Sequence, residues 1–352
     1  MNNSYRGKLM ANDQNEIAKI YQLVDQTTAQ LQKFLNESYT NALSENLFNW
    51  YQQKTFVEDG FPTPEQVVKL NQQYQKFNFA DYPLPIIKKA VELNIVKAQK
   101  TDQTDVNHLM SPDIVGTFCA LIIAEIFHAQ SRPVYEVVDP CVGTGNLLLE
   151  TKLELQKSTA LTLNLHGLDN DDVQLALADS YAQLIHESID LYHQDAIAAW
   201  MISDCDLALS DLPVGYYPLD NNALDFQTKA TTGHSYAHHL LMEQTMNNLR
   251  AGGIGIFIVP AQIFETEQAT TLAQWMVEKV FLQAVLTLPP KLFASKAAAK
   301  SLIVLQKHGP KAHQASPVLM GTLPDLQNKD AVNALKHNLQ TWSHKTFNEE
   351  DN

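Results

Sequence analysis

The sequence has few arginines, few cysteines and no long apolar run, and each shortage excludes a class of protein. Among 352 residues only Arg6, Arg132 and Arg250 are arginine. Because arginine is the usual reader of guanine and phosphate, this scarcity argues against tight, unaided binding to nucleic acid. The longest apolar run, residues 115–127, is too short to span a bilayer and contains Glu125, so no membrane segment is predicted.

The cysteines are also too few and too scattered for a disulfide framework or a metal site. Cys119, Cys141 and Cys205 lack the spacing of metal ligands, which favours free thiols in a cytoplasmic protein without a metal. The first 15 residues lack the apolar core of a secretory leader. A hydrophobic content of 45%, with no low-complexity tract, indicates a folded chain.

The net charge of −14 is unevenly distributed. Residues 101–278 carry 5 basic and 24 acidic side chains, whereas residues 279–352 carry 9 basic and 5 acidic ones. The acidic middle argues again against direct binding to a polyanion. The best local candidates for a phosphate contact are Lys291, Lys296, Lys300 and Lys307, although a solvated surface explains these lysines equally well.

The chain divides into two parts with different sequence patterns. Residues 1 to about 100 are helical in pattern: Ile17, Ile20 and Val24 recur at helical spacing, and Thr63-Pro64-Glu65-Gln66 is typical of a capped helix start. From about residue 130, β-branched apolar runs alternate with helical patterns, at residues 134–138, 161–168, 205–209, 254–259, 283–288 and 302–305. Alternation predicts an α/β fold with a mainly parallel sheet. The predicted domains are residues 1–104, 105–310 and a C-terminal strand/helix extension, 311–352.

A glycine turn joins the first strand to a helix. Asp139-Pro140-Cys141-Val142-Gly143-Thr144-Gly145-Asn146 follows the strand, and the helix start offers free N–H groups to an anionic ligand. An ordinary tight turn is the alternative interpretation. The next strand ends at Asp169, where a carboxylate can accept ribose hydroxyls. Leu148 occupies the third glycine position of a dinucleotide fingerprint, which disfavours a nicotinamide cofactor.

These residues resemble a known family. Asp139-Pro140-x-x-Gly143-Thr144-Gly145-x-Leu147-Leu148 is similar to the cofactor motif of the N6-adenine DNA methylases, which include the modification subunits of type I restriction systems. Further similar segments follow in the family's order: 108–115, 167–171, 193–195, 249–253, 288–293 and 300–305. The resemblance covers roughly residues 105–308. It implies a Rossmann-like class I methyltransferase sheet of seven strands, with S-adenosyl-L-methionine as cofactor.

The resemblance also implies a cofactor site. Ser111 would bind the methionine carboxylate, Asp169 the ribose, and Asp195 the adenine amino group. The full expected set is Ser111, Pro112, Asp139, Cys141, Gly143, Thr144, Gly145, Asn146, Asp169, Asn170, Asp195, Ala196 and Asp211.

The expected catalytic loop departs from the family's pattern. Where the family has Asn/Asp/Ser-Pro-Pro-Tyr/Phe, this chain has Asp211-Leu212-Pro213-Val214, as in a similar Gram-positive bacterial group. Asp211 and the Leu212 carbonyl can accept the two hydrogens of an exocyclic amine, and Pro213 is kept. Val214 cannot stack on a base, so Tyr216 or Tyr217 is expected to swing in instead. The alternative is a strand-end loop without catalysis.

Two other polar groups are predicted to be structural. Asp204 and Asp206 flank the start of a strand and are expected to be solvated turn residues rather than metal ligands. His238 and His239 are adjacent on a helix and face different directions, which disfavours a shared metal.

The sequence therefore predicts a methyltransferase acting on an amino nitrogen, with DNA adenine as the substrate that the resemblance implies. RNA or protein amides are alternatives. About 45 residues follow Lys307, fewer than a target-recognition domain needs, so either a partner protein supplies specificity or the substrate is not duplex DNA. The main rival is a non-catalytic cofactor-binding module that regulates or scaffolds a partner. A nicotinamide oxidoreductase is disfavoured by Leu148 and the Asp211 loop.

Overall fold

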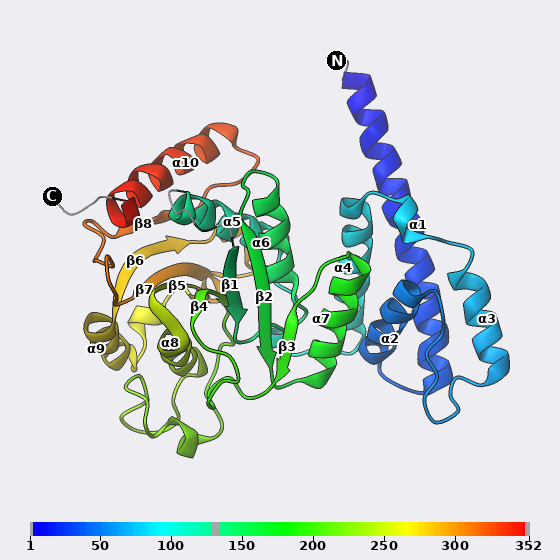
Figure 1. Ribbon diagram of the computed structural model, residues 1–352, viewed down its shortest axis with the longest axis horizontal. Coiled ribbons are helices and arrows are strands. Elements are labelled where there is room, and N and C mark those ends of the chain that lie inside the picture. Colours follow the sequence, from blue (N-terminus) through cyan, green and yellow to red (C-terminus); the bar gives the residue numbers. More distant parts are fainter. Residues whose placement is uncertain (1–2, 129–131, 133, 349–352) are drawn as a thin grey trace. The chain divides into compact units, whose positions relative to one another are not determined.

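The computed structural model describes residues 3–128, 132 and 134–348, and these form two compact units (Figure 1). The first unit comprises residues up to 110 together with 143–145 and 171–189. The second comprises residues 111–142, 146–170 and those from 190 onward. No helix in these described ranges combines the length and the apolarity needed to cross a bilayer.

The first unit is helical, as predicted for the N-terminal part of the chain. Its helices are α1 (Asn3–Leu35), α2 (Tyr39–Gln52), α3 (Pro64–Tyr74), α4 (Leu84–Thr101) and α7 (Asp172–Leu184). Ile20 and Val24 on α1 are fully buried, as their helical spacing indicates. The side chain of Gln66 accepts from the Thr63 backbone N–H at 2.8 Å, which confirms the predicted start of α3.

A buried polar network fixes how three of these helices pack. The Asn46 amide on α2 donates to the hydroxyls of Thr27 (2.9 Å) and Thr28 (2.8 Å) on α1, and its carbonyl accepts from Tyr74 of α3 at 2.8 Å. The Trp50 indole donates to Thr27 at 3.1 Å. Because unpaired polar groups are costly in an apolar interior, this network allows only one rotation of each helix.

The second unit is built on one eight-stranded sheet. Its strands are β1 (Val134–Asp139), β2 (Thr162–Asp169), β3 (Asp190–His193), β4 (Cys205–Asp211), β5 (Leu249–Pro260), β6 (Val280–Thr287), β7 (Lys300–Lys307) and β8 (Leu319–Thr322). The order is β3-β2-β1-β4-β5-β7-β6-β8, and the pairings are parallel except those of β7 with β5 and β6. The predicted α/β class with a mainly parallel sheet is confirmed.

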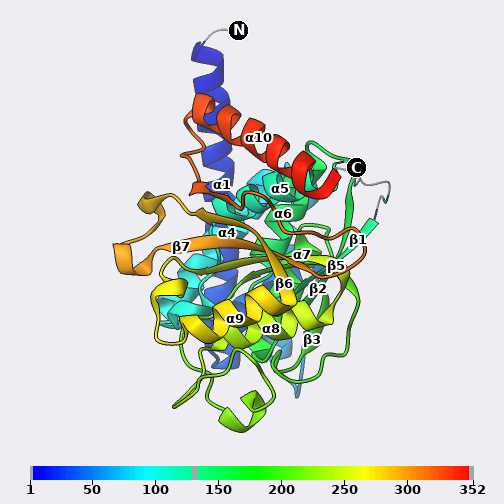
Figure 2. The same ribbon diagram turned by 90° about the vertical axis from the view of Figure 1, so that its left-hand side faces the viewer.

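Helices cover both faces of this sheet (Figure 2). One face carries α5 (Asp113–Phe127), α6 (Asn146–Gln156) and α10 (Lys329–Ser343), and the other carries α8 (Ala237–Asn248) and α9 (Ala269–Lys279). The apolar residues of β4, β5 and β7 between these layers are buried, which explains the apolar runs in β5 and β7.

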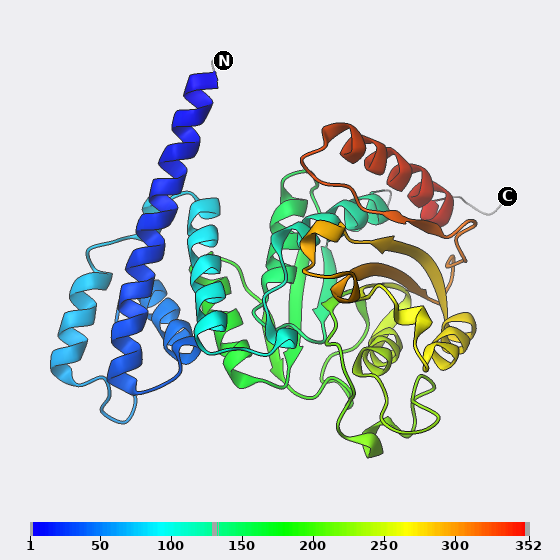
Figure 3. The ribbon, with the colours of Figure 1, turned by 180° about the vertical axis from the view of Figure 1, so that it is seen from behind.

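The C-terminal extension adds a strand to the sheet, so the expected count of seven was one too low. Strand β8 pairs parallel with β6, and α10 lies alongside α5 (Figure 3). The Ser343 hydroxyl donates to the Glu125 carbonyl at 2.6 Å, and the Trp342 indole donates to the Gln283 carbonyl at 3.1 Å. These bonds attach the extension to α5 and β6.

The Gly252-Gly253 pair follows α8, and in the sequence such a pair is typical of a helix stop. Helix α8 ends at Asn248, and Leu249 already pairs with Cys205 as the first residue of β5. The ladder then shifts register, and Gly252, with φ +76°, lies in the bulge. The glycine pair therefore serves a bulge in a strand rather than a helix end.

Asp206 is buried, contrary to the expectation of a solvated turn residue, whereas Asp204 is exposed. The Asp206 carboxylate accepts two hydrogen bonds from Arg132, at 2.6 and 3.1 Å, and one from the Glu136 backbone N–H at 2.8 Å. Arg250 lies 2.5 Å away on the other side. Two of the three arginines in the chain thus neutralise one buried carboxylate at the start of β4.

Replacing Asp206 with alanine is expected to lower the free energy of unfolding by about 2–3 kcal/mol, because Arg132 and Arg250 lose their partner. The loss is moderate because both arginines stay partly hydrated. Urea unfolding followed by circular dichroism measures this, with the exposed Asp225→Ala as a matched control. Equal stability of the two variants would contradict the role assigned to Asp206.

Candidate functional site

The expected site lies at the edge of the sheet where the strand order reverses. Chain order runs outward from β1 through β2 to β3 on one side and from β4 to β5 on the other. The carboxyl ends of parallel strands meet at one edge, and ligands bind in the crevice at such a reversal. Asp139, Asp169 and Asp211 are the last residues of β1, β2 and β4, and Asp195 follows β3 by two residues.

The turn after β1 adopts the backbone conformation that its glycines predict. Gly143 and Gly145 have φ of +49° and +74°, in the left-handed region that L side chains disfavour. A Cβ added at Gly143 would meet nothing within 4 Å, so the requirement there is conformational rather than steric. Helix α6 begins directly afterwards at Asn146, while the intervening Thr144 is buried.

Close packing ties this turn to β2. The Val142 N–H donates to the Leu168 carbonyl at 2.9 Å. A Cβ on Gly167 would come within 2.7–2.9 Å of the Val142 side chain, so only glycine fits at position 167. A glycine inside a strand is a known signal of such close approach, and the sequence reasoning had not assigned Gly167 this role.

Asp139 faces inward and joins β1 to β4. It is 2% exposed, and its carboxylate accepts from the Ser210 hydroxyl at 2.5 Å and from the Cys141 N–H at 2.9 Å. Burial raises the pKa of Asp139 to about 7, against the effect of both hydrogen bonds. Ser210 is not among the site residues expected from the sequence. A hydroxyl near the end of a buried strand is nevertheless a signal that could have identified Ser210 as a site residue.

Asp211 is held by two residues distant in sequence. Its carboxylate accepts from the Ser111 hydroxyl at 2.9 Å and from the Lys300 ammonium at 2.5 Å. Asn146 in turn donates to the Ser111 carbonyl at 2.8 Å, and Pro112 caps α5 beside it. The structure therefore brings Ser111, Asn146 and Asp211 together, and it adds Lys300, which sequence reasoning had considered only for phosphate.

Asp195 is partnered by the loop that follows β4. The Tyr217 hydroxyl donates to one carboxylate oxygen of Asp195, and the Ile197 N–H donates to the other at 2.9 Å. Burial and the hydrogen bond to Asp195 raise the pKa of Tyr217 to about 12. The residue after Asp195, Ala196, is buried beside it. Tyr217 thus links the β4 loop to the residues that follow β3.

The thiol of Cys141 lies near the strand-end carboxylates. Burial raises its pKa well above the ordinary value, and Asp139, Asp169, Asp195 and Asp211 also raise it. Asn170 belongs to the same edge, since its carbonyl lies 3.2 Å from the His193 ring.

Tyr216 is fixed in a stack, whereas sequence reasoning had expected a residue that swings. Its ring lies on that of Tyr236 with centroids 4.9 Å apart and an interplanar angle of 8°. Both hydroxyls bond to Glu267, at 3.3 Å from Tyr216 and 2.7 Å from Tyr236. Gly215 before it has φ +141°, a backbone conformation that L side chains rarely adopt, and Tyr216 remains 56% exposed. The outer face of an aromatic pair is thus presented beside the Asp211 loop.

The two adjacent histidines are buried rather than arranged around an ion. The rings of His238 and His239 lie 4.8 Å apart at 87°, and burial lowers their pKa values to about 4 and about 3. Both are therefore neutral near pH 7. Among the described residues, no three His, Cys, Asp or Glu side chains come together as a metal-binding group.

Three of the four candidate phosphate-binding lysines are engaged within the fold. Lys291 pairs with Asp325, Lys300 with Asp211, and Lys307 donates to the carbonyls of Asn247 and Leu249 at 2.7 and 2.5 Å. Their charges are partly neutralised or bound to backbone, which weakens the case for direct phosphate binding by this chain.

The comparison with family models identifies the second unit. The model described as N-6 DNA Methylase matches residues 111–352, which is more than half of the chain. This chain belongs to the N-6 DNA methylase family. A second model, the YtxK N-terminal helical domain, matches residues 18–99 of this methylase-family protein. The predicted family is therefore confirmed, and family and fold together make the chain a methyltransferase.

Individual relatives agree with this assignment. The protein YtxK of Bacillus subtilis (strain 168) is 33% identical over 331 residues, which are 94% of this chain and 98% of that protein. A candidate class I S-adenosylmethionine-dependent methyltransferase of Listeria monocytogenes has a crystal structure with a TM-score of 0.83 at 29% identity, covering 94% of this chain and 99% of that one. The methyltransferase subunit of a type I restriction-modification system from Streptococcus thermophilus (TM-score 0.60, 14% identity, 90% and 74% covered) shares the fold.

The raised pKa of Asp139 gives a prediction with a definite sign. In the folded protein this carboxyl binds a proton up to about pH 7, while in the unfolded chain it loses that proton near pH 4. Stability should therefore fall between pH 4 and pH 7, by up to about 1.4 kcal/mol per pH unit, and this contribution levels off above pH 7.

Asp139→Asn removes this titration. The stability of the variant minus that of the original chain is expected to rise from pH 5 to pH 7, and then to stay constant to pH 8. Urea unfolding at each pH measures the difference, and a pH-independent difference would show that Asp139 is ionised throughout.

Proposed function

We propose that this chain is an S-adenosylmethionine-dependent methyltransferase acting on an exocyclic amino nitrogen, with adenine N6 in DNA as its substrate class. One observation carries the proposal: Asp211 ends β4 at the strand-order reversal, directly before Leu212 and Pro213 and within 2.9 Å of Ser111. Family membership supports the amino-group chemistry. The free cysteines fit the proposed cytoplasmic location.

The residues at the strand ends fit this cofactor. Asp169 and Asp211 end β2 and β4, Asp195 follows β3 by two residues, and acidic side chains at this edge favour a cationic sulfonium. Asp169, at the end of β2, would accept ribose hydroxyls, and Gly143 leaves space where a side chain would stand. S-adenosylmethionine supplies a methyl group already activated on sulfur, so the chain's task is mainly alignment.

Asp211 and Leu212 would prepare the nucleophile. The lone pair of an exocyclic amine is delocalised into its ring, so the amine needs two acceptors to become tetrahedral and nucleophilic. The Asp211 carboxylate provides one acceptor and the Leu212 carbonyl the other. The Leu212 N–H donates to the Ile258 carbonyl at 3.1 Å, and its side chain is fully buried, so this peptide is rigidly held.

Tyr216 would take over base stacking. Val214 stands where the family has an aromatic residue, and it is 44% exposed. Two residues later, Tyr216 presents a ring whose back is covered by Tyr236 and whose hydroxyl is tied to Glu267. A fixed, exposed ring loses little entropy when a planar group stacks on it.

A partner protein would supply sequence specificity. The middle of the chain is acidic, and Arg132, Arg250 and Lys300 are already paired with carboxylates of the fold, which weakens the case for direct phosphate binding. The Streptococcus thermophilus protein of the same fold is a subunit of a restriction-modification system. A bound partner would add the basic surface that this chain has in short supply.

Transfer of labelled methyl from S-adenosylmethionine tests the proposal. We expect label in unmethylated genomic DNA, found as N6-methyladenine after digestion, and not in bulk RNA or whole-cell protein. Asp211→Ala should reduce the rate by about a hundredfold or more, because an acceptor at the reacting nitrogen is lost. Asp211→Asn, which keeps an acceptor oxygen without charge, should retain part of it.

The controls separate catalysis from binding. S-adenosylmethionine, and not a nicotinamide dinucleotide, should raise the melting midpoint of the original chain and of both variants. If S-adenosylmethionine binds but no pool is labelled, with or without cell extract as a source of partner, the non-catalytic regulatory function replaces this proposal.

Tyr216→Ala is expected to raise the KM for DNA about tenfold with little change in kcat, because one base-stacking surface is lost. Tyr216→Phe should restore the KM, since it keeps the ring. The exposed Tyr51 on α2 gives the matched control Tyr51→Ala. A KM that Tyr216→Ala leaves unchanged would exclude Tyr216 as the stacking residue.

A further inference from the structure

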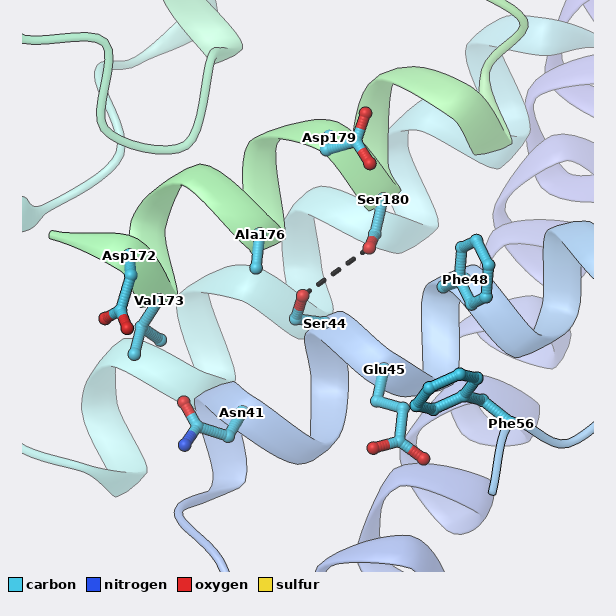
Figure 4. A pocket seen from close by; sticks show the side chains of 10 residues that line it. All are labelled: Asn41, Ser44, Glu45, Phe48, Phe56, Asp172, Val173, Ala176, Asp179 and Ser180. Carbon is cyan, nitrogen blue, oxygen red and sulfur yellow. Dashed lines mark hydrogen bonds between the residues drawn. The ribbon is translucent and has the colours of Figure 1, made fainter. Parts of the chain in front are cut away.

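The helical unit contains a groove that the methyltransferase chemistry does not use. It lies between α2 and α7, has a volume of about 460 Å³, and is shown in Figure 4. From α2 and the segment after it come Asn41, Ser44, Glu45, Phe48 and Phe56, and from α7 come Asp172, Val173, Ala176, Asp179 and Ser180. This volume is in the range of ordinary small-ligand sites.

Two aromatic rings make a corner at one end of the groove. The rings of Phe48 and Phe56 are nearly perpendicular, at 82°, with centroids 6.4 Å apart. Phe56 is 47% exposed, so its ring is accessible. Figure 4 shows Glu45 beside Phe56, with its carboxylate at the same end of the groove. Two ring faces beside a carboxylate form an environment that attracts a cation carrying apolar groups.

The charge of the lining has one sign. Glu45, Asp172 and Asp179 line the groove, and neither lysine nor arginine is among the lining residues. Burial is the main cause that raises the pKa of Glu45 to about 7; Glu37 and Glu58 also raise it, and a hydrogen bond with Asn49 lowers it. A cation bound beside Glu45 would stabilise its ionised form. The floor is small and neutral, since Ala176 lies there with Ser44 and Ser180, whose hydroxyls are 3.5 Å apart. A slender alkyl stem can lie along such a floor.

We propose that this groove binds an alkyl-guanidinium or alkyl-ammonium group, with the cation held by Glu45 and the Phe48–Phe56 corner. The stem lies toward Ala176. An arginine or lysine side chain of a peptide and a free polyamine share this chemistry. None of the strand-end carboxylates lines this groove, so the proposal does not depend on the proposed transfer reaction.

Binding to the full chain tests the charge requirement. The probes are Nα-acetyl-arginine amide, its neutral isostere Nα-acetyl-citrulline amide, an Arg-Lys-containing tripeptide, and spermidine, each titrated by calorimetry. We expect the cations to bind with a Kd in the millimolar range or tighter, and citrulline amide to bind at least about tenfold more weakly. The tighter of tripeptide and spermidine identifies the source of the cation.

Variants locate the site. Glu45→Gln and Phe56→Ala should each weaken arginine amide binding at least about fivefold. The controls Glu65→Gln and Phe61→Ala alter an exposed carboxylate and an exposed ring elsewhere in the unit and should leave the Kd unchanged. The melting midpoint of each variant checks folding. Equal binding of citrulline and arginine amides, no binding by any cation at about 10 mM, or unchanged affinity in folded Glu45→Gln and Phe56→Ala would overturn the proposal.

Discussion

The pairing of β4 directly beside β1 is the constraint on which the site depends. Val137 and Val138 pair with Leu207 and Ala208, and the Ser210–Asp139 hydrogen bond continues the connection past the last paired residues. The helices that follow these two strands, α6 and α8, lie on opposite faces of the sheet, so neither covers the strand ends between them (Figure 2). The glycine turn after β1 and the Asp211 loop after β4 are far apart in sequence, yet this single adjacency sets both at one edge of the sheet.

Features that depend on local sequence could be predicted, and those that depend on distant partners could not. The β-branched runs and the Thr63–Gln66 cap are short-range signals, and they correspond to the observed strands and to the start of α3. The burial of Asp206 depends on Arg132, 74 residues away, and Asp211 meets Lys300 across 89 residues. A C-terminal strand is predicted from the sequence, but its pairing with β6 is not. A periodicity shows that a segment can form a strand, and it does not show which strand will pair with it.

Placement of the charges explains how an acidic chain can belong to a family of DNA methylases. Arg132 and Arg250 stabilise a buried carboxylate, and Lys307 binds the end of α8 and the start of β5. These cations maintain the fold in which Asp211 is held, so they are not available to steer a polyanion. Two of the three arginines are therefore already paired with Asp206, so the chain is even less suited to bind DNA than a count of three arginines indicates. This placement of the cations is the reason for proposing that a partner protein brings the substrate close.

The contacts of Asp211 bear directly on whether the loop can act on an amine. A carboxylate has about four lone-pair positions, and Ser111 and Lys300 occupy one on each oxygen, which leaves capacity for a further donor. The Lys300 pair is partly exposed, with side-chain exposures of 27% for Lys300 and 20% for Asp211, so it stabilises the fold by only about 1 kcal/mol or less. An incoming amine therefore does not have to break a strong interaction. The ion pair with Lys300 orients the Asp211 carboxylate, and a carboxylate oxygen is a strong acceptor for an amine hydrogen. The replacement of the family's aromatic residue by Val214 removes a stacking surface, but it leaves this acceptor intact.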